Sequence, residues 1–194
     1  MGSTVKKVTY FDEPGPENSD EVFRVAKERA EELGIRDIVV ASTRGASGVR
    51  AVEVFKGYNV VVVTHSTGFR EPGVQELSEE NRRRIEEGGG KVLTATHIFG
   101  GVNRAVRRKF ETVSFADVIA QTLRLFGQGT KVAVEIVAMA ADAGLIPVDR
   151  DVIAIAGSGR GADTALVVKP AHTMRLFEDL FIREVIAKPR APRS

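Results

Sequence analysis

Apolar runs alternate with amphipathic segments along most of the chain, and this alternation predicts an α/β fold. The apolar runs are rich in valine, isoleucine and alanine, which is typical of strands buried on both faces of a sheet. We expect such strands at 37–42, 58–66, 91–97, 151–157 and 165–171. The pattern at 4–11 is compatible with a short lead-in strand.

Segments with apolar residues at helical spacing separate these strands. The segment that follows Ser19 carries them at this spacing and ends at Gly34, and Ser78 is a typical N-cap before a charged helix. We expect helices at 20–34, 47–56, 78–89, 114–127 and 130–144. The last of these is almost entirely apolar, which predicts that it is buried.

The alternation of strands and helices indicates a parallel sheet with helices on both faces. Only "SGRGADT" separates the fourth strand from the fifth, and this is too short to connect parallel neighbours. We therefore predict a single three-layer α/β/α domain, with a mainly parallel five-stranded sheet and an antiparallel last strand. Residues 1–17 are expected to form a lead-in segment and residues 188–194 a frayed tail.

Composition excludes several classes of protein and site. The chain of 194 residues has no cysteine, which excludes disulfides, thiolate zinc sites and cysteine nucleophiles. No apolar run is long enough to span a bilayer and no leader pattern opens the chain, so we expect a cytoplasmic protein without a membrane partner. A net charge of +2 and 6% aromatic residues argue against nucleic-acid binding. The basic cluster Arg104–Lys109 has the pattern of a solvated surface, and contact with an anion is the alternative.

Four segments rich in glycine and hydroxyl groups follow predicted strands. Ligands of open α/β sheets bind outside the carboxyl ends of the strands, so these segments predict one pocket, although each alone is also compatible with a simple turn. The segment 42–48 opens a helix and suits a phosphate, because free N–H groups and the helix dipole attract anions. The predicted phosphate site is Ser42, Thr43, Gly45, Ser47 and Gly48. The remaining predicted pocket residues are His65, Thr67, Gly68, Phe69, His97, Phe99, Gly157, Ser158, Arg160, Gly161, Asp163 and Thr164.

Other kinds of site have less support. The run Gly157–Ala162 matches a dinucleotide fingerprint, but a strand follows it where a helix is needed, and there is no Walker A motif. We interpret His65 and His97 as hydrogen-bonded pocket walls, because a third metal ligand is not evident. Glu135 is interpreted as the ion-pair partner of Lys131, one helical turn away. No Gly-x-Ser-x-Gly elbow for a serine hydrolase occurs.

Two parts of the chain resemble the C-terminal α/β domain of pyruvate kinase. They are the order of strand, hydroxyl- and glycine-rich loop, helix and valine strand that starts at Ile38, and the ending "DVIAIAGSGRGADTALVV". The run "AGSGRGADTALVVKPA" is similar to stand-alone archaeal members of that family, which are associated with bound FMN. The resemblance thus implies FMN as the phosphate-bearing ligand. Phe69 or Phe99 would then be the wall for its ring, Arg160 would bind the phosphate or a flavin carbonyl, and Asp163 would accept from the ribityl hydroxyls or the ring N–H.

The resemblance does not imply kinase activity, because the chain lacks the catalytic barrel. It leaves open a flavin-dependent oxidoreductase whose reaction the sequence does not identify. The alternative is a regulatory or assembly domain that binds a sugar phosphate. The sequence also leaves open whether identical copies associate, and what His172 does.

Overall fold

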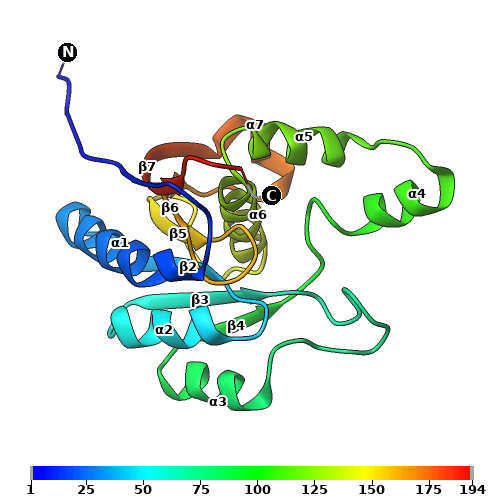
Figure 1. Cartoon of the computed structure of the whole chain (residues 1–194), viewed down its shortest axis with the longest axis horizontal. Helices are drawn as coiled ribbons and strands as arrows, with labels where there is room; N and C mark the ends of the chain where they lie inside the picture. The colour runs from blue at the N-terminus through cyan, green and yellow to red at the C-terminus, as the bar shows by residue number, and fades with distance from the viewer. Residues whose placement is uncertain (1, 193–194) are drawn as a thin grey trace.

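A computed structural model describes residues 2–192 and contains one seven-stranded sheet with helices on both faces (Figure 1). The strands are β1 (Thr9–Phe11), β2 (Asp37–Ala41), β3 (Asn59–Thr64), β4 (Lys91–Thr94), β5 (Val152–Ala156), β6 (Thr164–Lys169) and β7 (Phe181–Pro189). The helices are α1 (Ser19–Leu33), α2 (Ala46–Val54), α3 (Glu79–Glu87), α4 (Val102–Phe110), α5 (Phe115–Arg124), α6 (Gln128–Asp142) and α7 (Leu176–Asp179). Short 3-10 turns cover Pro16–Asn18 and Thr173–Arg175.

The strand order is β1-β7-β6-β5-β2-β3-β4, and β6 alone runs against the other strands described between residues 2 and 192. Strands β2 to β5 are parallel to one another. Because β7 is antiparallel to β6 and parallel to β1, both run in the same direction as β2. The prediction of a mainly parallel sheet, with an antiparallel strand after the short β5–β6 connection, is confirmed. The carboxyl ends of β2 to β5 lie at one edge, called the carboxyl edge below.

The prediction of a five-stranded sheet is wrong, because the lead-in strand expected at 4–11 joins the sheet as β1 and the unpredicted β7 lies beside it. Strand β6 is therefore not the last strand, and the chain expected to fray from residue 188 belongs to the sheet as far as Pro189. The two residues after it donate backbone hydrogen bonds to Phe11 and Asp12. Strand β7 escaped prediction because charged residues interrupt its apolar pattern, as at Arg183–Glu184. Residues 193 and 194 of the predicted tail lie outside the described residues.

Alternate residues of each strand face different helix layers, which confirms the three-layer architecture. Val40 and its neighbours on one face pack against α1, α2 and α3. Val39 and its neighbours on the other face pack against α6. Helix α6 is almost wholly buried, as its apolar sequence predicted, because α5 covers its outer side through a contact of Ala120 with Val134.

Helix α4 was not predicted as a helix, and it projects from the body of the molecule (Figure 1). It contains no buried residue, and Arg107, Arg108 and Lys109 form its last turn. Its sequence nevertheless has apolar residues at helical spacing, a pattern that the interpretation as a basic surface cluster overlooked: Val102, Ala105, Val106 and Phe110. Neither α4 nor any other helix described in residues 2–192 is long and apolar enough to cross a membrane.

Gly48 brings α2 close to the sheet and to α3. A Cβ at this position would lie 2.7 Å from both Val62 Cγ1 and Ile85 Cδ1. Gly48→Ala should therefore lower the free energy of unfolding by about 1–3 kcal/mol, the usual cost of overpacking, which exceeds the gain in helix propensity of up to about 1 kcal/mol. Urea unfolding would measure the change. Gln121→Ala, on the exposed side of α5, is the control and should shift stability by less than about 0.5 kcal/mol.

Candidate functional site

The segment 42–48 leads from β2 into α2 and is held in shape by its own hydrogen bonds. The Ser42 hydroxyl accepts from the backbone N–H of Gly48 at 3.1 Å. Gly45 precedes the helix with φ 104°, and a Cβ there would lie 2.3 Å from Asn81 Cβ, so only glycine fits. The first helical N–H groups, on Ala46 and Ser47, have no acceptor within the helix. The positive end of α2 thus faces the carboxyl edge.

Three of the four predicted loops meet at this edge because β3 lies between β2 and β4. Nε2 of His65, which follows β3, is 3.4 Å from Oγ1 of Thr43, which follows β2. The ring of His97, which follows β4, has its centroid 5.5 Å from that of His65. The two histidines singled out from their equivalent strand ends are therefore neighbours.

His65 is oriented by a carboxylate that was not among the predicted site residues. Its Nδ1 lies 2.6 Å from Oε2 of Glu76, whose other oxygen lies 3.2 Å from Nε of Arg70. Because a carboxylate only accepts, Nδ1 of His65 donates and Nε2 keeps its lone pair toward Thr43. Burial lowers the pKa of His65, and the opposing effect of Glu76 does not compensate. We infer that His65 is neutral at about pH 7.

Glu135 of α6 is 1% exposed and accepts from three donors. Its Oε1 receives the backbone N–H of Phe99 at 2.9 Å, and its Oε2 contacts His97 Nδ1 at 3.3 Å and the Lys131 ammonium. Burial alone would raise the pKa of Glu135, but the contacts with His97 and Lys131 prevail and hold it at about 2. The predicted ion pair with Lys131 is confirmed, and His97 is a second partner.

His97 is held between two acceptors. Its Nε2 lies 3.2 Å from the backbone oxygen of Thr64, while Nδ1 faces Glu135. Both ring nitrogens of His97 are therefore occupied by contacts within the protein. Burial lowers the pKa of Lys131, the cation beside Glu135. The wall of the site thus combines His65, with one nitrogen facing a hydroxyl, and His97, with both nitrogens facing oxygen atoms of the protein.

Phe69 and Arg104 form the outer layer of this cluster. The ring of His65 stacks on Phe69 with centroids 3.8 Å apart, and the guanidinium carbon of Arg104 lies 4.2 Å from the Phe69 centroid. Two groups this close cannot share one ring face, so both faces of Phe69 are covered. Burial, followed by the nearby Arg108 and Arg107, lowers the pKa of Arg104. Phe99, the other predicted aromatic wall, is 7% exposed and lies near Lys131.

In the fourth predicted loop, between β5 and β6, buried polar groups form hydrogen bonds with one another. Asp163 is fully buried, and its two oxygens accept from the N–H of Ser158 at 2.9 Å and the hydroxyl of Thr164 at 2.8 Å. A Cβ on Gly157 would lie 2.4 Å from the backbone oxygen of Gly161, so the turn is tight. These contacts fix the conformation of the β5–β6 connection at the carboxyl edge.

Three other predicted residues lie on the outside of their loops. Arg160 is exposed in the β5–β6 connection. Thr67 is exposed and receives the side chain of Gln75 at 3.4 Å. Gly68 has φ 78° and donates to the backbone of Val74 at 2.9 Å, so it shapes a turn. In the described conformation these residues form the rim of the site.

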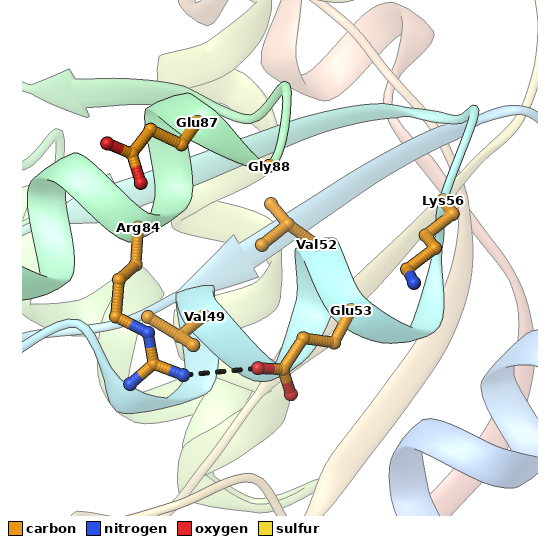
Figure 2. A pocket seen from close by; sticks show the side chains of 7 residues that line it. All are labelled: Val49, Val52, Glu53, Lys56, Arg84, Glu87 and Gly88. Carbon is orange, nitrogen blue, oxygen red and sulfur yellow. Dashed lines mark hydrogen bonds and ion pairs between the residues drawn. The ribbon is translucent and has the colours of Figure 1, made fainter.

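Two hollows in the surface lie away from the predicted residues. One, of about 440 Å³, follows the seam between α2 and α3, where Figure 2 shows Arg84 reaching Glu53 at 3.2 Å. Its lining is Val49, Val52, Glu53, Lys56, Arg84, Glu87 and Gly88. The other, of about 730 Å³, lies at the end of α6 and is lined by Asp142, His172, Thr173, Met174, Arg175 and Glu178. His172 lies 3.5 Å from Asp142, so this histidine belongs to a different region from His65 and His97.

Sequence reasoning missed Glu76 and the positions of Arg104 and Glu135 within the site. Glu76 lies in an irregular loop, where nothing in a single sequence marks it as the partner of His65. Arg104 belongs to the basic cluster that was interpreted as solvated surface. Glu135, an acidic residue in an apolar helix, was the strongest available signal, but the sequence indicated only Lys131 as its partner.

Comparison with known proteins places the chain among pyruvate kinase domains. The family model described as "Pyruvate kinase, alpha/beta domain" matches residues 20–168, which is more than half of the chain. Among solved structures, two of pyruvate kinase from Cryptosporidium parvum match 79% of this chain with a TM-score of 0.40 and 13–14% identity, one of them a complex with ADP. The matched region is 23% of one of those chains and 24% of the other, so this chain spans about a quarter of each enzyme.

Glu135→Gln should destabilise the protein by about 3–5 kcal/mol at about pH 7, because it leaves the Lys131 ammonium buried without its counter-charge. Since the pKa of Glu135 falls from 4.5 to about 2 on folding, the stability it contributes is complete above 4.5 and disappears as the pH falls toward 2. The deficit of the variant should therefore shrink over that range. Urea unfolding at several pH values would measure it, with the exposed Glu87→Gln as control. A deficit that does not change with pH would contradict this account of the charge.

Proposed function

The chain belongs to the pyruvate kinase α/β domain family, and we propose that it binds a phosphate-bearing small molecule at the carboxyl edge of its sheet. The observation that carries this proposal is that α2 begins after Gly45 without a side-chain cap from that residue, next to the hydroxyl-bearing residues Thr43 and Ser47. Backbone N–H groups, hydroxyls and the positive end of a helix dipole together suit a phosphate. Kinase activity is not part of the proposal.

Arg104 supports the same proposal. It is half-buried, and within residues 2–192 no carboxylate lies at ion-pair distance from it. Burial and the neighbouring arginines lower its pKa, and the attraction to Glu135 offsets this only in part, so its charged form is incompletely compensated. An anion bound at the carboxyl edge would supply that compensation.

We propose FMN as the first ligand to test, on the resemblance to flavin-associated members of the family. The residues present fit its phosphate end, which Thr43, Ser47 and the first N–H groups of α2 would hold. They do not offer a free aromatic face for the ring, because His65 and Arg104 cover both faces of Phe69. This second observation favours a smaller ligand, a sugar phosphate, as the alternative.

Titration with each ligand separates the two candidates. FMN bound at a defined site would change its visible absorbance and stay with the protein through gel filtration. A sugar bisphosphate, measured by calorimetry, would bind without colour. Retention of FMN supports the flavin, whereas tight binding of the sugar bisphosphate with loss of FMN supports the regulatory alternative.

Ser47→Asp should abolish binding of any phosphate ligand while the fold survives. The new carboxylate would stand at the helix end that otherwise accepts the anion, and like charges repel at this short range. Ser3→Asp makes the same change of charge on the exposed N-terminal segment, away from the body of the molecule (Figure 1), and should leave affinity unchanged. Calorimetric titration of both variants measures the difference. Equal affinities for the Ser47 variant and the wild type would remove α2 from the site.

A further inference from the structure

His65 links a hydroxyl on one side to a carboxylate on the other, an arrangement that ligand binding alone does not require. A hydroxyl, an imidazole and a carboxylate follow one another: Thr43 Oγ1 lies 3.4 Å from His65 Nε2, and His65 Nδ1 lies 2.6 Å from Glu76 Oε2. Nucleophilic hydroxyls are activated by this order of groups, and the hydroxyl–histidine contact is commonly loose before a substrate binds. Thr43 lies in the connection from β2 to α2, whereas His65 and Glu76 lie in the connection from β3 to α3, so the fold brings two loops together to form the arrangement.

The state of each group agrees with this role. Glu76 holds Nδ1 as the donor, so the lone pair of Nε2 points to the Thr43 hydroxyl. A second interaction, with Arg70, holds Glu76. His97, in contrast, has both ring nitrogens committed to Glu135 and Thr64 and does not compete for the same proton. Among the three histidines of the chain, His65 is thus the one with a basic nitrogen directed at a hydroxyl.

We propose that Thr43, His65 and Glu76 form an acyl-transfer site that hydrolyses acyl phosphates. The proposal rests on the phosphate site at the start of α2, which lies three residues beyond Thr43 in the sequence. In an acyl phosphate, Ser47 and the first N–H groups of α2 would hold the phosphate group, and the attached acyl carbon would lie against the Thr43 hydroxyl, which stays free to attack. Phosphate is also a good leaving group, so the site needs no strong acid to expel it.

Each step balances without an oxidant or reductant. The oxygen of Thr43 attacks the acyl carbon while Nε2 of His65 takes the hydroxyl proton. The bond from the acyl carbon to the phosphate oxygen breaks, and the proton passes to the departing phosphate. Water then attacks the acyl-threonine ester with His65 again as the base, which releases the carboxylic acid and restores the hydroxyl. Thr43 and His65 are the catalytic residues, and Glu76 is a positioning residue.

Acetyl phosphate is the probe for this reaction. The protein should release phosphate from it faster than buffer does, and rapid acid quenching should trap one acetyl group on the peptide that contains Thr43. Thr43→Ala should abolish the adduct and lower turnover by about 100-fold or more, while Thr43→Ser should keep both. Glu76→Gln weakens the contacts with His65 and with Arg70; it should lower kcat through the orientation of His65 and leave KM unchanged, because Glu76 lies behind His65 and does not bind the substrate. His172→Gln, outside the site, should match the wild type.

Calorimetry with inorganic phosphate, together with circular dichroism of each variant, separates the possible failures. If phosphate binds but acetyl phosphate is not turned over, the acyl-transfer site is wrong and the proposed function stands. If neither phosphate nor acetyl phosphate is bound, both are wrong. A phosphoryl group on Thr43, or turnover that survives Thr43→Ala in a folded protein, would also overturn the inference.

Discussion

The buried carboxylate of Glu135 joins the helix layer to the loops that carry the site. It projects from α6, which lies between the sheet and α5, and binds the main chain at Phe99 and the ring of His97. His97 in turn contacts the backbone of Thr64, the last residue of β3. One negative charge therefore sets the position of the loop after β4 relative to the end of β3. Burying such a charge is costly, and its three donors are what make the carboxylate tolerable.

Around this carboxylate, two chemically identical side chains have different properties. His65 is desolvated and has one carboxylate and one hydroxyl as partners, which favours the neutral ring. His97 instead has its two ring nitrogens against the Glu135 carboxylate and the backbone oxygen of Thr64. The two ring centroids are 5.5 Å apart, yet only His65 directs a nitrogen at a hydroxyl. A ligand that exchanges a proton at this edge would use His65.

Features set by local sequence could be predicted, whereas those set by long-range contacts could not. The valine run of β3, the cap at Ser78 and the short β5–β6 connection each depend on neighbouring residues, and each agrees with the structure. Strand β7 depends on its pairing with β6. Helix α4 is an exception, because its apolar residues do stand at helical spacing and its dense basic residues drew the interpretation as a surface cluster instead. In the site, the strand ends predicted where His65 and His97 would lie. The contacts of Glu76 with His65 and of Arg104 with Phe69 depend on the conformations of the connections after β3 and β4. Hydrophobic periodicity does not predict such conformations.

The pairing of β1 with β7 limits the order in which the strands can join the sheet during synthesis. Thr9 needs Ala187 as its neighbour, so the first strand has no place in the sheet until residues 187–189 have left the ribosome. Strands β2 to β4 pair with near neighbours in sequence and can assemble much earlier. Contacts between distant residues form slowly because a long loop must close first. Until that loop closes, the edge of β7 that β1 covers stays unpaired, and an unpaired edge can bind a chaperone or pair with another chain.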